Sequence, residues 1–569
     1  METIFVQRHC DATIASEIEK SGKPKVLAKI LASRGEIPGD GNSLKDILPW
    51  NGDRGFKGVL DAANILADAV QGAKKIVIVA DYDADGATAC AVGIRSLRAM
   101  GAIVDFAVPD RMTMGYGLSV DVIDFVVPMK PDLLLTVDNG ISSHAGINYA
   151  AELGIPVVVT DHHLAGETVP DAVAIVNPNQ PGCPFPSKNL AGVGTIFYAM
   201  LALRHVLKER GHFADGKNQI PNMAALLDLV ALGTVADIVK LDRNNRILVA
   251  EGLKRIAADT CNPGIAALSQ VAMKDRARLT SVDLGFVIGP RLNAAGRMDD
   301  MSVGIQCLTT DNADEAMELA KELDRLNKER REVETTMRAD VERLLPDTND
   351  FDRYTLAVYD PEWHPGVIGI LASRIKERIN RPVITFAKGT VDGEIRGSGR
   401  SISGFHLRDV MERIHITHPG LIIRFGGHAM AAGLTIDESR LDEFKDAFEK
   451  IGREWMTPEV LSNRVEHDGA ISLSDASVEL VEKIGAEIWG QGFPEPLFAG
   501  DFRVVKQKIM KEKHSKLTLE QGGKTIEAVL FNFADKAPER IKAFYTLMVN
   551  EWNGAKKTEL NIKHIESAA

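Results

Sequence analysis

Apolar β-branched runs alternate with amphipathic segments through the first half of the chain. The stretches 74–80, 132–138 and 155–161 are nearly continuous apolar runs, a pattern typical of strands that are buried on both faces of a parallel sheet. Apolar residues at helical spacing precede the first of them, over 58–72. Because such strands alternate with helices of about 10 to 15 residues, the pattern predicts βαβ units and a doubly wound parallel sheet. We place this α/β domain at 46–310.

A long helical pattern follows this domain. Over 311–345, apolar residues recur every three or four positions opposite a charged face. A helix of that length, about 50 Å at 1.5 Å per residue, suits a connector between two lobes, although it could also lie on the surface of one domain. A second α/β unit is expected at 350–455. From 463 to 569, short alternating stretches indicate an all-β module, a barrel or small sandwich. Residues 1–45 lack strong periodicity and are expected to be a polar lead-in.

Composition narrows the class of protein. The 569 residues carry 67 Lys and Arg against 79 Asp and Glu, 45% are hydrophobic and 26% are charged, which excludes a disordered, collagen-like or coiled-coil chain. Apolar runs fall short of the ~18 residues that span a bilayer, and charges interrupt the first twenty positions where a signal peptide would be apolar. The five cysteines are scattered without a CxxC pair, so they indicate neither a disulfide framework nor a thiolate zinc site. We therefore expect a cytoplasmic protein; its net charge of −12 still allows a local basic groove.

Acidic side chains follow three predicted strands where each strand ends. They are Asp81, Asp83 and Asp85 after the first run, Asp138 after the second, and Asp161 with His162 and His163 after the third. Ligands of open parallel sheets bind outside the carboxyl ends of the strands, so these side chains are expected to meet at one rim. Carboxylates gathered without partners would repel one another. A pair of divalent cations would neutralise them.

The donor types at this rim indicate which metal it holds. Carboxylates with one or two imidazoles suit Mn²⁺ or Mg²⁺, and no thiolate is offered for zinc. Two ions about 3.5–4 Å apart can clamp the attacking and leaving oxygens of a phosphoryl displacement. The Asp-x-Asp-x-Asp-Gly turn by itself could be an Asx-rich turn or a lone cation site. Together with the other two strand ends, it favours a two-metal phosphoesterase.

The same segments carry a resemblance to a known family. VIVADYDADGATA, LLLTVDNGIS, VVVTDHHLAGE and GTVADIVKL resemble, in order, the four motifs of the DHH phosphoesterase superfamily. WHPGVIGILASR, GSGRSISGFHL and RFGGHAMAAGL resemble its companion DHHA1 domain. With MGYGLS, GPRLNAAGRM and the β module, the likeness extends from about 46 to 565 and is greatest to the superfamily's single-strand-specific DNA exonucleases. It implies an OB fold at the C-terminus and 5′-to-3′ hydrolysis of single-stranded DNA to 5′-mononucleotides in recombination and repair.

The resemblance also implies a role for each rim residue. Asp83 and Asp85 would each hold one ion, Asp138 would bridge both, His162 and Asp237 would complete the second site, Asp81 would support the first, and His163 would contact the scissile phosphate. Taken alone, Asp237 follows an apolar run and is more typical of a helix cap. Val79 stands where some members have a histidine, so we expect a weaker or more hydrated first metal site than in those members.

Two glycine-containing segments of the second α/β unit are candidates for holding the end of the strand. The stretch 397–401 and the triplet Gly426, Gly427 and His428 could form an anion cradle, or could be a pair of tight turns. The resemblance favours Ser398 and Arg400 as a clamp for the terminal 5′-phosphate, with His364 facing the same cleft. A fixed chain end would place the first phosphodiester at the metals.

Further candidates for DNA contact lie outside these motifs. In irregular, glycine-containing segments we expect backbone and base contacts, or simply solvated side chains, from Arg111, Tyr116, Arg291, Asn293 and Arg297. By the resemblance, such side chains would line a passage too narrow for a duplex. The C-terminal module holds a run of lysines that is either a solvated face or a guide for single strands: Lys506, Lys508, Lys511, Lys513 and Lys516.

The resemblance implies a monomer whose partners, besides single-stranded DNA, are a single-strand-binding protein and a DNA helicase. One alternative is a superfamily phosphodiesterase for short oligonucleotides or cyclic dinucleotides, which would have no use for the lysine-rich module. Another is a non-catalytic scaffold with a DHH core. The intact rim acids argue against the scaffold, because a protein without metals has no need of mutually repelling carboxylates.

Overall fold

The computed structural model describes residues 3–38, 43–49, 55–110, 114, 117–214, 219–258, 260–344, 352–552 and 554–568. The chain divides into two compact units. The first contains Ile47–Val239 and Leu248–Asn463, and the second contains Thr3–Asp46, Lys240–Ile247 and Arg464–Ala569. None of the helices in the described ranges combines the length and apolarity needed to cross a membrane.

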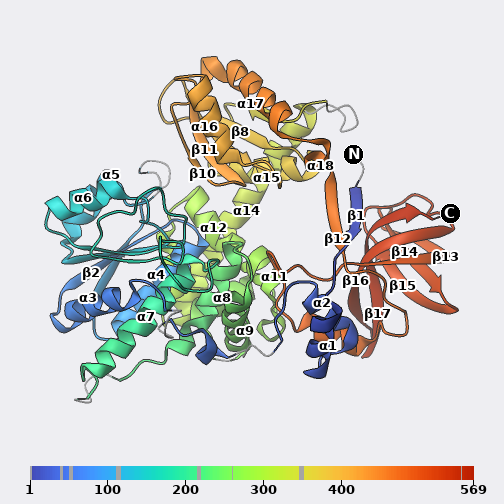
Figure 1. Cartoon of the computed structure of the whole chain (residues 1–569), viewed down its shortest axis with the longest axis horizontal. Helices are drawn as coiled ribbons and strands as arrows, with labels where there is room; N and C mark the ends of the chain where they lie inside the picture. The colour runs from blue at the N-terminus through green and yellow to red at the C-terminus, as the bar shows by residue number, and fades with distance from the viewer. Residues whose placement is uncertain are drawn as a thin grey trace. The chain divides into compact units, whose positions relative to one another are not determined.

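The first sheet of the larger unit is the predicted parallel sheet. Its strands lie in the order β3-β2-β4-β5-β6, and every neighbouring pair is parallel. They are β2 (Lys75–Ala80), β3 (Ile103–Ala107), β4 (Leu133–Val137), β5 (Val157–Thr160) and β6 (Ala174–Val176). Because the chain runs outward to β3 on one side of β2 and to β4 on the other, the order reverses between β2 and β4, where ligands of doubly wound sheets bind. The helices of this region, labelled in Figure 1, include α3 (Val59–Gln71), α4 (Ala84–Ala99), α5 (Val120–Val126), α6 (His144–Glu152) and α7 (Gly192–Glu209).

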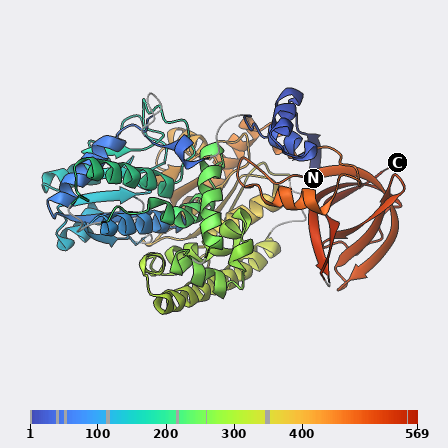
Figure 2. The same ribbon diagram turned by 90° about the horizontal axis from the view of Figure 1, so that it is seen from below.

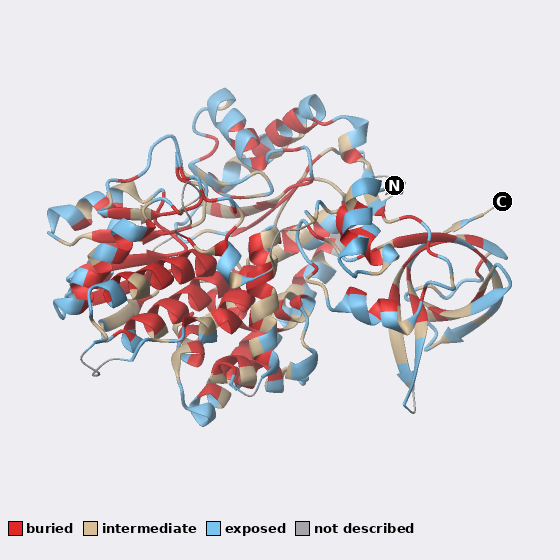
Figure 3. Cartoon of the chain, turned by 60° about the horizontal axis from the view of Figure 1, so that its bottom comes forward, coloured by how far each residue is buried: buried red, intermediate tan, exposed pale blue. Residues whose placement is uncertain are grey.

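A helical layer completes this domain. It comprises α8 (Leu227–Ala236), α9 (Arg243–Ala257), α10 (Pro263–Val271), α11 (Ser281–Asp283), a π-helical turn η6 (Leu284–Ile288), α12 (Gly289–Met298), α13 (Ser302–Thr309) and α14 (Ala313–Leu344). Helix α14 packs against α10, α12 and α13, so the long helix predicted over 311–345 is confirmed. Figure 3 shows that buried residues dominate the central helices and strands of the larger unit.

The second sheet of the larger unit is mixed. Its order is β10-β11-β9-β8-β7, from β7 (Leu356–Tyr359), β8 (Val383–Lys388), β9 (Glu394–Arg400), β10 (Arg424–Gly427) and β11 (Ala431–Asp437). Within this sheet β7 pairs with β8 in parallel, and the other neighbouring pairs are antiparallel. The accompanying helices are α15 (Ile368–Ile379), α16 (Leu407–Thr417), α17 (Leu441–Trp455) and α18 (Pro458–Leu461). Phe386, Phe444 and Phe448 are fully buried in the core beside it.

The smaller unit contains the predicted C-terminal barrel, seen as the red strands of Figure 2. Strands β13 (Phe498–Met510), β14 (His514–Gln521), β15 (Lys524–Leu530), β16 (Arg540–Trp552) and β17 (Ala555–Ser567) close in the order β13-β14-β15-β17-β16. Because the barrel is closed, each of these five strands pairs with a neighbour on both sides. The sequence reading missed a helix, α19 (Val478–Gly485), which precedes the barrel.

Residues expected to be a polar lead-in are instead folded. They form β1 (Thr3–Gln7), α1 (Ala12–Lys20) and α2 (Lys25–Ala32), and β1 pairs with β12 (Asn463–His467) in a two-stranded sheet. The side chains of Leu27 and Ile30 in α2 are buried. The ion pair of Arg34 with Asp468, at 2.6 Å and almost fully buried, ties this segment to the C-terminal part. Short helices gave too little periodicity for the sequence to reveal them.

Candidate metal centre

The rim acids are presented by the turns that follow β2, β4 and β5. Asp83 is the N-cap of α4, and its carboxylate accepts hydrogen bonds from the backbone N–H groups of Asp85 (2.9 Å) and Gly86 (3.0 Å). Asp138 follows β4 with a φ of +62°, a left-handed conformation that is uncommon for a residue other than glycine and is enriched at functional sites. The potential ligand atoms of Asp81, Asp83 and Asp138 lie within 4.8 Å of one another, as do those of Asp138, His162 and His163, so the predicted convergence of the strand ends is confirmed.

Two glycines let helices approach these acids closely. A Cβ added to Gly192, the first residue of α7, would lie 2.6 Å from the Cβ of Asp138. A Cβ added to Gly233 of α8 would lie 3.0 Å from Oδ1 of Asp85. The Asp85 carboxylate accepts hydrogen bonds from the backbone N–H groups of Gly192 (2.6 Å) and Val193 (2.9 Å), so it also caps the positive end of α7.

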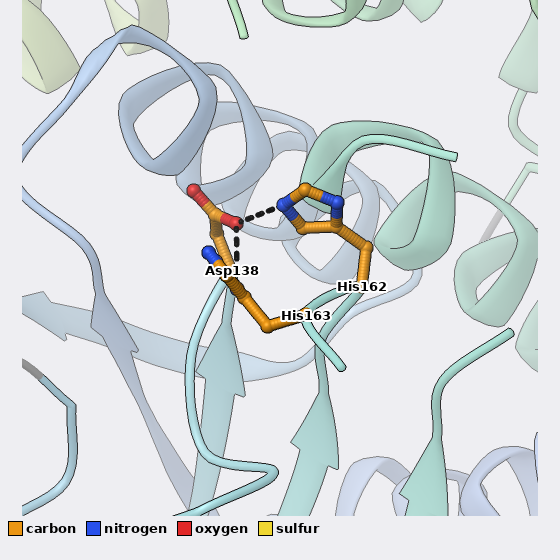
Figure 4. Close-up of side chains that lie close together, drawn as sticks. All are labelled: Asp138, His162 and His163. Atoms are coloured by element: carbon orange, nitrogen blue, oxygen red, sulfur yellow. Dashed lines mark ion pairs between the residues drawn. The ribbon is translucent and has the colours of Figure 1, made fainter. Parts of the chain in front are cut away.

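The acids and histidines form three overlapping groups, in each of which the potential ligand atoms lie within 4.8 Å of one another. These groups are Asp81 with Asp83 and Asp138, Asp85 with His162 and Asp237, and Asp138 with His162 and His163. Oδ1 of Asp138 lies 3.1 Å from Nε2 of His162 and 3.9 Å from Nδ1 of His163, as the dashed lines in Figure 4 indicate. Nε2 of His162 lies 3.4 Å from Oδ2 of Asp237. Because Asp138 belongs to two groups, its position suits a carboxylate shared by two ions.

Burial makes this cluster unstable as a set of free anions. Loss of hydration, together with neighbouring carboxylates, raises the pKa of Asp138 well above its usual range, that of Asp85 to about 7 and that of Asp237 to about 8. Burial and the neighbouring His163 lower the pKa of His162, which favours the neutral imidazole that metals bind. Nε2 of His162 and Oδ2 of Asp237 are buried, and neither makes a hydrogen bond within the described ranges. An oxygen- and nitrogen-donor set of this kind fits Mn²⁺ or Mg²⁺.

Asp161 has a different orientation from the other rim acids. Oδ2 accepts a hydrogen bond from the N–H of Ile141 (2.9 Å), and Oδ1 accepts one from the N–H of His162 (2.7 Å). Oδ1 also lies 2.8 Å from Nδ1 of His163. Although burial alone would lower it, this bond and the charge of Asp161 raise the pKa of His163 to about 9. Sequence reasoning counted Asp161 among the rim acids but did not find this orienting contact, because a side chain's direction cannot be read from its position after a strand.

Val79, which stands where some family members have a histidine, lies on strand β2, and the sheet fixes the direction of its side chain. Its side chain is fully buried in the core that contains Leu134 and Val159. Asp81, two residues later, belongs to the same ligand group as Asp83 and Asp138. The expectation of a weaker first metal site remains a prediction.

The anion-cradle candidates lie on strands of the second sheet rather than in turns. Ser398 and Arg400 belong to β9, and Gly426 and Gly427 belong to β10, so the alternative of tight turns is wrong for these four residues. His428 follows β10, where its N–H donates to the carbonyl of Ala431 (2.7 Å) at the turn into β11. Nη1 of Arg400 donates to Oγ of Ser398 (3.3 Å). A Cβ added to Gly369, in the first turn of α15, would lie 2.8 Å from that Oγ and 2.9 Å from Nη2 of Arg400. The strand therefore presents Ser398 and Arg400 directly beneath the start of α15.

His428 lies beside the metal centre, and His364 lies where the second α/β unit contacts helix α12. The ring of His428 lies 5.9 Å from that of His163, with 18° between the ring planes. Nδ1 of His364 accepts a hydrogen bond from the N–H of Gly366 (3.1 Å), whose carbonyl accepts one from Nη1 of Arg297 (3.2 Å). The sheet that carries the cradle candidates thus reaches the rim of the first sheet.

The expectation of irregular structure is wrong for Arg291, Asn293 and Arg297, which all lie on helix α12. Oδ1 of Asn293 accepts a hydrogen bond from the N–H of Ala84 (2.9 Å), beside Asp83. Arg291 is only 8% exposed and pairs with Asp324 at 2.8 Å, so its guanidinium joins α12 to α14. The glycines of this segment suggested loops, but they allow close approach: a Cβ added to Gly289 would lie 3.0 Å from the Cβ of Ala236 on α8, and one added to Gly296 would lie 1.8 Å from the carbonyl oxygen of Tyr82. Arg111 and Tyr116 lie outside the described residues.

The lysine run of the barrel is divided between two strands and a turn. Lys506 and Lys508 lie on β13, Lys516 lies on β14, and Lys511 and Lys513 lie in the turn between them. Lys516 pairs with Glu559 (3.3 Å) and Glu527 (3.6 Å), which offsets its charge. Sequence reasoning missed Phe531, which is 54% exposed with its ring 5.2 Å from that of His514. An aromatic residue directly after a strand of the lysine-rich module is the sequence signal that could have found it.

Three stretches match known domain families. Residues 75–234 match the N-terminal domain of the DHH family, residues 352–454 the DHHA1 domain, and residues 467–564 the RecJ OB domain. The chain is 47% identical to the single-stranded-DNA-specific exonuclease RecJ of Escherichia coli, over 95% of this chain and 96% of that protein. It is 34% identical to the protein of the same name from Thermus thermophilus, over 88% of this chain and 69% of that protein.

Solved structures give the same result. The crystal structure of RecJ from Thermus thermophilus in complex with Mn²⁺ matches with a TM-score of 0.83 and 28% identity, over 99% of this chain and 79% of that chain. A crystal structure of exonuclease RecJ bound to manganese matches with a TM-score of 0.60 and 34% identity, over 72% of this chain and 98% of that chain. The predicted resemblance to the DHH superfamily and the OB fold of the C-terminal barrel are confirmed.

Proposed function

Since this chain belongs to the RecJ family of single-stranded-DNA-specific exonucleases, we propose that it degrades single strands from the 5′ end and releases 5′-mononucleotides. It is a metal-dependent exonuclease that uses Mn²⁺ or Mg²⁺. The observation that carries the proposal is the meeting of four ligand candidates at one rim, of which Asp85 and Asp138 are buried and His162 and Asp237 are partly buried.

We assign the acids to two ions. Asp81 and Asp83 would hold the first, Asp85, His162 and Asp237 the second, and Asp138 would contact both; the shared membership of Asp138 in two ligand groups supports this. When bound, a pair of such ions stabilises the charge of a phosphoryl transition state and activates water. The chain's own residues fix the geometry, because α7 and the β4 turn hold Asp85 and Asp138 in place before substrate arrives.

His163 is proposed to contact the scissile phosphate. Its raised pKa favours the imidazolium, whose N–H groups can stabilise the charge that develops on phosphate oxygens. Asp161 orients the ring by holding Nδ1, which leaves Nε2 for the substrate. The nearby ring of His428 is proposed to lie on the same side of the cleft.

The 5′ polarity is attributed to Ser398 and Arg400. A terminal phosphate carries more negative charge than a phosphodiester, and a guanidinium beside a helix N-terminus suits such a group. The position of Gly369 against both side chains supports this placement, since it brings the first turn of α15 to them. His364, Gly426 and Gly427 are proposed to line the same pocket.

The remaining assignments concern longer substrates and partners. The lysines of β13 and its following turn, together with the exposed Phe531, are proposed to guide single strands by phosphate contact and base stacking. A single-strand-binding protein and a helicase that supplies unwound strands are the proposed partners, in the repair and recombination of DNA in the cytoplasm. Single-stranded DNA is the substrate of the named relatives.

The test uses purified chain, Mn²⁺ and one oligonucleotide labelled at either end. Early release of a labelled mononucleotide from the 5′-labelled strand alone, with a duplex left intact, is the expected result. Early release from the 3′ end would overturn the polarity. Failure to cut the long strand, with rapid hydrolysis of dinucleotides, would instead favour a phosphodiesterase for short substrates. An Asp138→Asn chain should bind the strand but not cleave it.

A further inference from the structure

Helix α16 brings an arginine to the neighbourhood of the metal centre. The helix packs against strands β10 and β11 (Figure 1), which are joined by a turn that begins at His428. The N–H of Leu407, the first residue of α16, donates to the carbonyl of Ala429 in that turn (2.9 Å). The start of the helix is therefore fixed beside His428, whose ring lies 5.9 Å from that of His163. The next residue of the helix is Arg408, and it is exposed.

The electrostatics of His428 also indicate that the guanidinium of Arg408 lies near it. Burial lowers the pKa of His428 most, and the positive charges of His163 and Arg408 lower it further. The influence of a charge falls with distance, and water and salt screen it. An exposed guanidinium has this effect on a neighbouring imidazole only when the two groups are close. The backbone contact of α16 and the charge of Arg408 therefore agree on where this side chain lies.

The acids nearest to Arg408 on the helix do not neutralise it. The carboxylate of Asp409 lies 3.0 Å from Nδ1 of His406, the N-cap residue of α16. Glu412 stands four residues after Arg408, the spacing at which helical ion pairs form. Among the residues that the structure describes, however, the guanidinium of Arg408 makes no ion pair and no hydrogen bond. An accessible cation is therefore available to a ligand at this place.

The chemistry of this cation suits the backbone of a DNA strand. The chain has a net charge of −12 and its metal centre gathers carboxylates, so a polyanionic strand needs cations along its path to the ions. An arginine holds a phosphate both by its charge and by its fork of N–H donors. The proposed function already gives the terminal phosphate to Ser398 and Arg400 and the scissile phosphate to the ions and His163. The phosphate that follows the scissile one is left for Arg408.

We propose that Arg408 binds the phosphate that follows the scissile one, and that this contact makes the enzyme hold longer strands more tightly than dinucleotides. The inference deepens the proposed function and rests on it, since the strand must present its first phosphodiester to the ions. Arg408 is a substrate-binding residue in this role, because it contacts no reacting atom. A contact that is equally strong in the ground state and the transition state lowers KM and leaves kcat unchanged.

The experiment measures release of the first nucleotide from a 5′-phosphorylated, 5′-labelled single strand by the full-length chain at saturating Mn²⁺. In Arg408→Ala, KM should rise about tenfold, because a charge-assisted hydrogen bond is lost, while kcat stays that of the original chain. The slope of log(kcat/KM) against log[KCl] should become shallower by about 0.7, the contribution of one phosphate contact on a single strand. Arg408→Lys, which keeps the charge, should retain the slope of the original chain.

Arg413→Ala is the matched control. Arg413 is an exposed arginine of the same helix, but it lies five residues after Arg408 and is therefore turned by about 140° around the helix axis. Its KM and salt slope should stay those of the original chain. A 5′-phosphorylated dinucleotide is the second control, because it has no phosphate after the scissile one. Arg408→Ala should cleave it as fast as the original chain does; slower cleavage would mean a structural role and would overturn the proposal.

Strands with one uncharged methylphosphonate, placed at each phosphate in turn, identify the group that Arg408 binds. In the original chain, the substitution just after the scissile position should raise KM about tenfold. In Arg408→Ala the same substitution should change KM by no more than about twofold, because the contact is already lost. Coupling at no position, or with the terminal phosphate alone, would overturn the proposal. If the original chain releases no mononucleotide from the 5′ end, the proposed function fails; if it does and Arg408→Ala behaves identically, only the role of Arg408 fails.

Discussion

Gly192→Ala is the substitution that tests the metal centre most directly without touching a ligand. The added Cβ would lie 2.6 Å from Cβ of Asp138 and 2.8 Å from its Cγ and Oδ1. Ordinary van der Waals contact for a Cβ begins at 3.4 Å and the added Cβ would lie at 2.6 Å, so Asp138 and the start of α7 must separate by roughly 0.8 Å. Displacements near 1 Å in a reacting site can cost about 100-fold in rate. We therefore expect cleavage of a 5′-labelled single strand to fall about 100-fold at saturating Mn²⁺.

The same helix supplies the control. The three atoms nearest to a Cβ added to Gly194 all belong to the side chain of Leu190, the nearest at 3.2 Å, and the leucine can turn aside. Gly194→Ala should therefore retain activity within about a factor of three, since helix propensity also favours alanine over glycine. Both chains should unfold cooperatively near the midpoint of the original. Full activity in Gly192→Ala would refute the argument, because it would mean that Asp138 can shift without consequence for the metals.

Three other outcomes follow from the site. The raised pKa values of Asp85 and Asp237, about 7 and 8, mean that the folded metal-free chain binds more protons than the unfolded chain. The temperature midpoint of unfolding should therefore fall as pH rises from 6 to 8.5. Added Mn²⁺ should raise this midpoint by more at pH 8.5 than at pH 6. A metal-free midpoint that rises over this window would contradict that sign. Asp161→Asn should lower kcat by about 10-fold or more, because it loses the contact with Nδ1 of His163. The affinity for Mn²⁺ should stay near that of the original chain. An equal loss of kcat and of Mn²⁺ affinity would mean that Asp161 supports the metal ligands instead. Arg400→Ala should reduce the preference for a 5′-phosphorylated end over a 5′-hydroxyl end about tenfold or more, as measured by competition between the two substrates, and an unchanged preference would place the clamp elsewhere.

The elements that bring the ligands together were predictable because their signals are local. Three β-branched runs, each followed by an acid, specify the strands and the side of the sheet where the acids gather. The features that could not be predicted from the sequence depend on how closely segments far apart in the chain approach one another. The glycines at 192 and 233 are ordinary helix residues until α7 and α8 are packed against the acids. The orientation of the Asp161 side chain depends on a hydrogen bond from the backbone N–H of Ile141, which lies twenty residues earlier in the chain.

Asp237 could have been found by physical reasoning from the sequence. Following an apolar run, it was open to the interpretation of a helix cap, and it does occupy the C-cap of α8. Acids, however, favour the N-terminal end of a helix, because the C-terminal end carries partial negative charge. An aspartate at this end, in a chain region without nearby lysine or arginine before Lys240, is electrostatically unfavourable unless a cation offsets it. The misfit between residue and helix end was itself evidence for a metal.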